Sequence, residues 1–190
     1  KQIYLQVMTR YFLANQMAFS LILEEVRVEN CFQKILSIWL NTMPNITQNE
    51  DKKLMALGLC SLLTIPNENI FENFATIIIN VYETLCDIMT LETPESAEVD
   101  SLILTDATDM EGMCDFDEGY EYKTPHYDRY KSMCLKDPVH SIVLKEYLQS
   151  QLLALKTAVG DERYVTLIKT IDPTIHKLLY NYVNTFVPVV

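Results

Sequence analysis

Residues 68–91 read ENIFENFATIIINVYETLCDIMTL, and the spacing of their apolar residues decides the fold class. The apolar side chains recur at alternating steps of three and four residues, at Phe71, Phe74, Ile78, Val81, Leu85 and Ile88. That spacing puts them on one face of a helix. The stretch is rich in β-branched residues, which favour strands, but its length and regular spacing predict a helix from Glu68 to Leu91.

The residues before this helix predict two more. Asn30 to Met43 forms one, with Trp39 on its buried side. Thr47, with Glu50 three residues later, is typical of a capping box that starts the next. That helix is apolar on nearly every side from Leu54 to Leu63, so it must be packed on several sides.

Further helices are expected towards both ends of the chain. Asp-Pro pairs suit the first turn of a helix, because Asp can cap it and Pro fits its first position. Gly suits the position after a helix. The expected helices are Ile3–Ala14, Gln16–Val26, one from Asp137-Pro138 to Val159 with Gly160 after it, Glu162–Thr170, and one from Asp172-Pro173 to about Asn184.

Helix pairs joined by short turns predict an all-α fold of HEAT-type repeats, whose period is roughly 40–47 residues. We expect a HEAT-repeat (armadillo-like), right-handed superhelical solenoid, in which stacking makes the inner helices apolar all round. An irregular helical bundle is the alternative. The expected division is helix pairs over residues 1–91, a long loop over residues 92–136, and capping helices over residues 137–190. Because the chain starts at Lys1 and not Met, we expect it to begin inside a longer protein.

The net charge of −11 belongs to one segment. No Lys or Arg occurs between Lys53 and Lys123, and Glu92 to Tyr122 carries eleven acidic residues. The other acidic residues balance the basic ones, so the scaffold outside this segment is neutral. A concentrated charge of this kind indicates a local interaction surface. It disfavours nucleic-acid binding, which needs clusters of Lys and Arg.

Other classes of protein are disfavoured by what the sequence lacks. No run approaches the about 20 apolar residues of a membrane-spanning helix. Five cysteines with no close pair predict free thiols, not a disulfide framework. Cys114, His126, Cys134 and His140 match no common zinc spacing, so we expect no metal site and interpret the histidines as surface residues. None of His126, His140 and His176 adjoins a nucleophile motif, and no phosphate loop is present, so neither catalysis nor a cofactor is expected.

The acidic segment is the candidate binding site. Its predicted contacts for a basic partner are Asp109, Glu111, Asp115, Asp117, Glu118 and Glu121. A solvated insertion without a partner is the alternative. The following residues, up to Lys136, mix tyrosines with basic side chains and could anchor the loop to the helices. Near the C-terminus, Tyr180, Tyr182 and Phe186 either cap the last helix pair or form a small docking patch.

Several strings resemble the C-terminal region of nuclear transport receptors of the importin-β superfamily, the karyopherins. They are Asn45-Ile46-Thr47-Gln48, Lys53-Leu54, Ala56-Leu57, Asp87-Ile88-Met89-Thr90 and Leu135-Lys136-Asp137-Pro138-Val139-His140. The last, after an acidic loop and before a long helix, is the most specific. The matches keep their order from about Trp39 to the last helix. The amino-acid sequence of the acidic loop, by contrast, does not match.

The resemblance implies a receptor that shuttles between cytoplasm and nucleus. Such receptors bind protein cargo, contact Phe-Gly nucleoporins in the pore, and release cargo to Ran-GTP. Ran-GTP would bind N-terminal repeats that this chain does not contain, and cargoes of such receptors are often basic. The alternatives are a helical-repeat scaffold subunit without a transport role and an enzyme whose catalytic domain lies upstream.

Overall fold

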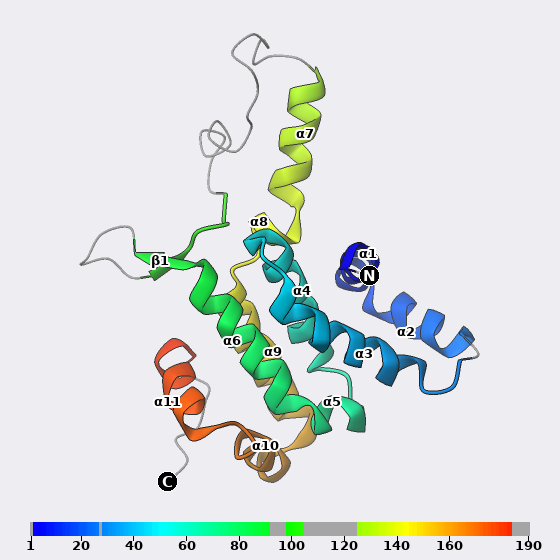
Figure 1. Ribbon diagram of the computed structural model, residues 1–190, viewed down its shortest axis with the longest axis vertical. Helices are drawn as coiled ribbons and strands as arrows, with labels where there is room; N and C mark the ends of the chain where they lie inside the picture. The colour runs from blue at the N-terminus through cyan, green and yellow to red at the C-terminus, as the bar shows by residue number, and fades with distance from the viewer. Residues whose placement is uncertain (1, 27, 92–97, 105–124, 184–190) are drawn as a thin grey trace.

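The computed structural model describes residues 2–26, 28–91, 98–104 and 125–183 (Figure 1). These residues fold almost entirely into helices, which confirms the predicted all-α class. The helices are α1 Gln2–Ala14, α2 Gln16–Glu25, α3 Cys31–Thr42, the 3-10 turn η1 Met43–Asn45, α4 Asn49–Leu62, α5 Glu68–Glu72, α6 Phe74–Ile88, α7 Pro125–Lys136, α8 Pro138–Ser141, α9 Leu144–Val159, α10 Asp161–Ile168 and α11 Pro173–Tyr182. The strands β1, Met89–Leu91, and β2, Glu98–Asp100, form an antiparallel hairpin.

Helix α4 is the centre of the molecule, as its apolar sequence predicted. Every residue from Lys53 to Leu62 is buried. The helix packs against α1, α6 and α9, so it meets neighbours on several sides. Its start differs from the prediction: Gln48 precedes the first turn, without a side-chain cap, so the capping box of Thr47 and Glu50 is wrong. Ile46, buried after the 3-10 turn, holds the chain to the core just before the helix begins.

The predicted helix over residues 68–91 is present as two helices and a strand. Helix α5 ends and α6 begins at Asn73, whose amide side chain donates to the Asn69 carbonyl at 2.8 Å. From Phe74 to Ile88 the predicted apolar face is buried. At Met89 the backbone becomes extended and pairs with Asp100, so the last residues of the predicted helix form β1.

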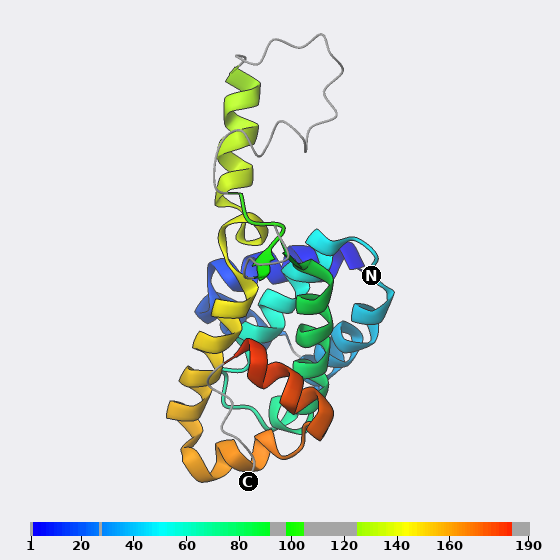
Figure 2. The ribbon, with the colours of Figure 1, turned by 90° about the vertical axis from the view of Figure 1, so that its left-hand side faces the viewer.

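The predicted loop over residues 92–136 is wrong at its C-terminal end. Its last residues form α7, which projects from the body of the molecule in both views (Figures 1 and 2). The predicted contacts Asp109, Glu111, Asp115, Asp117, Glu118 and Glu121 lie outside the described residues. Of the acidic segment over residues 92–122, the structure therefore describes residues 98–104.

Both Asp-Pro pairs start helices, as predicted. Asp137 Oδ1 accepts the Val139 amide at 3.0 Å, and Asp172 Oδ1 accepts the Thr174 amide at 2.8 Å. The helix predicted from Asp137 to Val159 is interrupted, because Ile142 and Val143 are extended and separate α8 from α9. Gly160 follows α9 with a φ of 82°, a backbone conformation that favours glycine.

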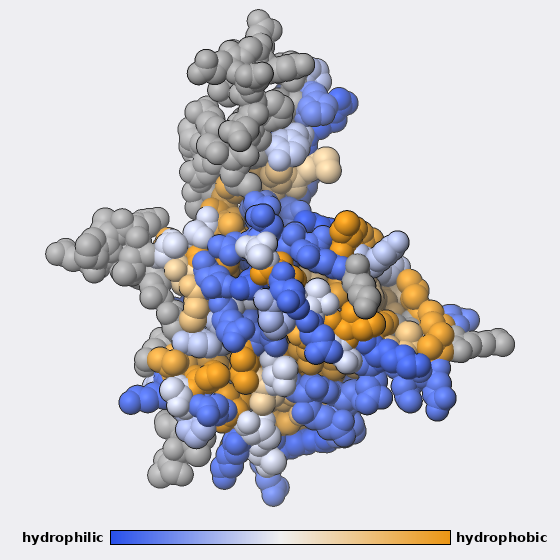
Figure 3. Space-filling model, viewed as in Figure 1, coloured by the Kyte–Doolittle hydropathy of each residue, from blue (hydrophilic) through white to orange (hydrophobic). Residues whose placement is uncertain are grey.

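One face of the first helix pair is apolar and exposed. It carries Ile3, Tyr4, Val7 and Tyr11 on α1 and Met17, Leu21 and Ile22 on α2. Figure 3 shows hydrophobic surface over α1 and α2 at the right of the view. No described helix is both long enough and apolar enough to cross a membrane.

Candidate interaction site at the base of the acidic insertion

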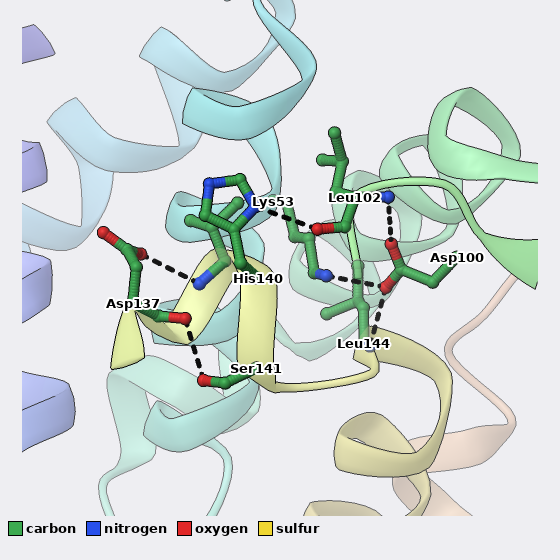
Figure 4. A network of polar contacts seen from close by, with 8 residues as sticks. Lys53, Asp100, Leu102, Asp137, His140, Ser141 and Leu144 are labelled. Carbon is green, nitrogen blue, oxygen red and sulfur yellow. Dashed lines mark hydrogen bonds and ion pairs between the residues drawn. The ribbon is translucent and has the colours of Figure 1, made fainter. Parts of the chain in front are cut away.

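A buried ion pair lies close to residues 102–104, where the described chain stops before residues 105–124, the stretch that we call the acidic insertion (Figure 4). The Nζ of Lys53 on α4 lies 2.8 Å from Oδ2 of Asp100 on β2, and both side chains are almost fully buried. Burial lowers the pKa of Lys53, and the hydrogen bond and charge of Asp100 oppose that shift. A buried cation needs such a partner, because an uncompensated charge in the core is costly.

Asp100 also accepts backbone hydrogen bonds from two other segments. Oδ1 accepts the amide of Leu102 at 3.2 Å, and Oδ2 accepts the amide of Leu144 at 3.3 Å. One carboxylate therefore joins α4, the hairpin and the first turn of α9. This is the opposite of the role expected of an acidic residue in a solvated loop. Asp100 contributes its charge to the core and not to the surface.

His140 fixes the chain just before the insertion. Its Nδ1 lies 2.9 Å from the carbonyl oxygen of Leu102, and its own carbonyl accepts the amide of Leu104 at 3.2 Å. His140 is buried, so its interpretation as a surface residue is wrong. It holds residues 102–104 against α8, which follows directly after α7.

The other attachment is fixed at the same place. Asp137, between α7 and α8, caps α8 and forms an ion pair with Arg10 of α1. Residues 102–104 and the base of α7 thus meet at α8, close to Arg10 of α1 and Lys53 of α4, whereas the N-terminal end of α7 projects away from the body (Figure 1). We call this group, Arg10, Lys53, Asp100, Asp137 and His140, the anchor of the insertion.

The anchor has no arrangement typical of catalysis or metal binding. His140 lies against a backbone carbonyl, and Asp100 is occupied by a lysine and two amides. Of the residues that were considered and rejected as zinc ligands, Cys134 is half-buried on α7, His126 is exposed, and Cys114 lies outside the described residues. Over the described ranges, no three His, Cys, Asp or Glu side chains gather as a metal site. What the anchor can do is hold a charged segment at a fixed point on the scaffold.

Sequence reasoning missed the anchor, although one signal was visible. Lys53 is the last cation before the long gap without Lys or Arg, and it lies at the start of an apolar helical run. A lysine in such a position requires a buried acid. The tertiary fold decides which acidic residue pairs with Lys53. The sequence prediction grouped Asp100 with the solvated acidic residues, so it did not identify the ion pair.

Comparisons with known proteins agree over almost the whole chain. Residues 1–184 match the family described as "Importin-11-like, TPR repeats". Importin-11 of Mus musculus is 33% identical over 97% of this chain, and importin-11 of Homo sapiens is 32% identical over 96%. The importin beta-like protein KAP120 of Saccharomyces cerevisiae is 24% identical over 82%. No solved structure matches the chain with significance.

The chain spans about a fifth of the length of the importin-11 relatives, 19% in each case. The family description uses the term TPR where the sequence predicted HEAT. Both repeats are pairs of helices that stack on their neighbours, and the observed helices fit that common architecture.

Proposed function

The chain belongs to the importin-11-like family of nuclear import receptors, and from that premise we propose that it is the cargo-binding, C-terminal part of a Ran-dependent receptor. The receptor carries proteins through the nuclear pore and shuttles between cytoplasm and nucleus. Its partners are basic protein cargo, Phe-Gly nucleoporins, and Ran-GTP bound by repeats outside this chain. The relatives are importins, which fits a binding protein and not an enzyme.

The anchor is the observation that carries the cargo-binding role. Between Leu104 and the start of α7 the chain carries seven acidic residues, from Asp106 to Glu121, and a single basic one, Lys123. The described chain on both sides of this stretch is tied to the scaffold, at residues 102–104 by His140 and at the base of α7 by Asp137. A concentrated negative charge at a fixed point attracts a basic partner and orients its approach.

We propose a division of the chain into three parts that fits this role. Residues 1–91 form scaffold helices, residues 92–136 present the charge, and residues 137–190 close the array. The exposure of apolar side chains supports a closing role for the last helices. Ile3 and Val7 of α1 are 72% and 65% exposed, whereas Leu178 of α11 is 40% exposed. An end repeat needs a more polar outer face than a repeat that is covered by a neighbour.

The test is neutralisation of the densest acidic cluster in the full-length receptor. The variant carries Asp115→Asn, Asp117→Asn and Glu118→Gln, and cargo affinity is measured across a range of salt concentrations. We expect the variant to bind cargo more weakly at low salt and its affinity to depend less on salt. Salt screens the attraction between the acidic cluster and a basic cargo, and the substitutions already remove that attraction. The matched control is neutralisation of Asp161, Glu162 and Glu146, exposed acids on α9 and α10. Unchanged affinity at low salt would remove the insertion from cargo recognition.

A further inference from the structure

A pocket of about 410 Å³ lies where α10 turns into α11, at the end of the molecule away from α7 (Figure 1). Its volume is in the range of roughly 300–1,000 Å³ typical of ligand sites. Ile168 and Ile171 are buried and contribute apolar surface, together with Pro173. Figure 3 shows apolar residues over α11 bordered by hydrophilic ones.

The sequence of α11 explains why this face is available. Leu179 and Val183 are buried, and Ile175 packs against the same core, so they hold the helix to the body. The pocket is lined by the adjacent face of α11, from Pro173, His176, Lys177 and Tyr180. These positions follow the three-and-four spacing of one helix face.

Two residues of the pocket, Lys169 and Lys177, are cationic in a chain of net charge −11. Both line the pocket, are exposed, and form no ion pair with any described residue. Five other cations of the described ranges, Arg10, Lys52, Lys53, Lys156 and Arg163, pair with carboxylates, whereas Lys169 and Lys177 are open to a carboxylate from outside the chain. Asp172, between the two lysines in sequence, already accepts the Thr174 amide, and this bond lowers its pKa.

We propose that the pocket between α10 and α11 binds an acidic peptide segment of a partner protein. An apolar or aromatic side chain of the peptide enters against Ile168, Ile171 and Tyr180, and flanking carboxylates pair with Lys169 and Lys177. The two lysines favour a ligand with negative charge. The apolar surface favours a peptide with apolar side chains over a simple anion. A nucleic acid is less favoured, because phosphate tracking requires a longer line of cations. The inference goes beyond cargo binding by the insertion, which concerns a basic partner at the opposite end, and does not depend on it.

The test uses the full-length protein and a fluorescein-labelled peptide of alternating glutamate and phenylalanine, followed by fluorescence anisotropy. Lys169→Glu with Lys177→Glu is expected to weaken binding about tenfold or more, since four units of charge change beside the ligand. Both lysines are exposed, so the variant should keep the wild-type melting temperature. The matched control, Lys131→Glu with Lys136→Glu on α7, makes the same charge change elsewhere and should leave the affinity within about twofold.

Two further probes separate the alternatives. A peptide with glutamine in place of glutamate and one with alanine in place of phenylalanine should both bind about tenfold more weakly. No binding of the acidic peptide, equal binding of either altered peptide, or equal loss in the α7 control would overturn the proposal. So would tighter binding of single-stranded oligothymidylate that the Lys169 and Lys177 substitutions abolish, because the site would then belong to a nucleic acid.

Discussion

At the scale of single residues, the decisive contact is the ion pair between Lys53 and Asp100. It joins the central helix α4 to strand β2 of the hairpin, four residues before the described chain stops at residue 104. Buried pairs do not necessarily add stability relative to a well-packed apolar core. Their effect is one of specificity, since a single arrangement satisfies both charges. Here that arrangement sets where the insertion leaves the scaffold.

The first prediction concerns this pair. Lys53→Met or Asp100→Leu alone should destabilise the protein by about 3–5 kcal/mol, because each leaves an uncompensated buried charge. The double substitution should recover part of the loss, because it removes both charges but leaves the amides of Leu102 and Leu144 without their acceptor. Urea unfolding of the three variants measures both effects.

The control for this prediction is the neighbouring pair of Lys52 and Asp87, whose side chains are partly exposed. Lys52→Met should cost less than about 1 kcal/mol, as surface pairs do. If the loss of stability in the double variant equals the sum of the losses in the two single variants, Lys53 and Asp100 do not interact.

At the scale of elements, α4 depends on a close approach of its neighbours at Gly58. A Cβ placed there would lie 2.6 Å from both Thr9 Cγ2 of α1 and Trp39 Cζ2 of α3. Glycine is unfavourable inside a helix on its own account. Its presence here is explained by packing, since it lets two helices meet α4 at one point.

We therefore predict that Gly58→Ala destabilises the protein by about 2 kcal/mol, because overpacking outweighs the gain in helix propensity. Ala154→Gly on the exposed side of α9 provides the comparison, and there alanine should be the more stable residue by about 1 kcal/mol. Thermal or urea unfolding measures whether each substitution raises or lowers the free energy of unfolding. A Gly58→Ala protein as stable as the wild type would show that α1 and α3 can move apart without cost.

Elements with a strong internal pattern could be predicted from the sequence. The period of α6, the apolar α4 and the caps at Asp137 and Asp172 are local features, and all three were confirmed. The hairpin could not be predicted, because its strands have three residues each and their pairing depends on Asp100 meeting Lys53. Helix α7 was missed since its polar sequence buries little. The acidic cluster from Asp109 to Glu121 stays a prediction.

At the scale of the whole molecule, the exposed apolar face of α1 and α2 contrasts with the other end. A patch of this kind is uncommon on a protein that works alone. The relatives are about five times longer than this chain, which covers 19% of importin-11. We expect another helix pair of the receptor to cover the face by the same stacking that joins the helices here.

This expectation predicts different costs at two exposed positions of the full-length receptor. Ile3→Asp with Val7→Asp should lower the melting temperature by several degrees, because the charges would enter an apolar interface. Leu153→Asp on α9, where the leucine is 55% exposed, should change it by at most about a degree. Equal small effects at both places, measured by differential scanning fluorimetry, would show that the α1 face is solvated in the whole receptor.

The central claim is that this chain presents an acidic insertion to the cargo of a Ran-dependent receptor. The most direct measurement is capture of nuclear proteins by the full-length receptor and by the Asp115, Asp117 and Glu118 neutralised variant, each with and without Ran-GTP. We predict that the wild type captures basic proteins that Ran-GTP releases, and that the variant captures markedly less of the same proteins. Equal capture by both, or bound proteins that Ran-GTP does not release, would contradict the account.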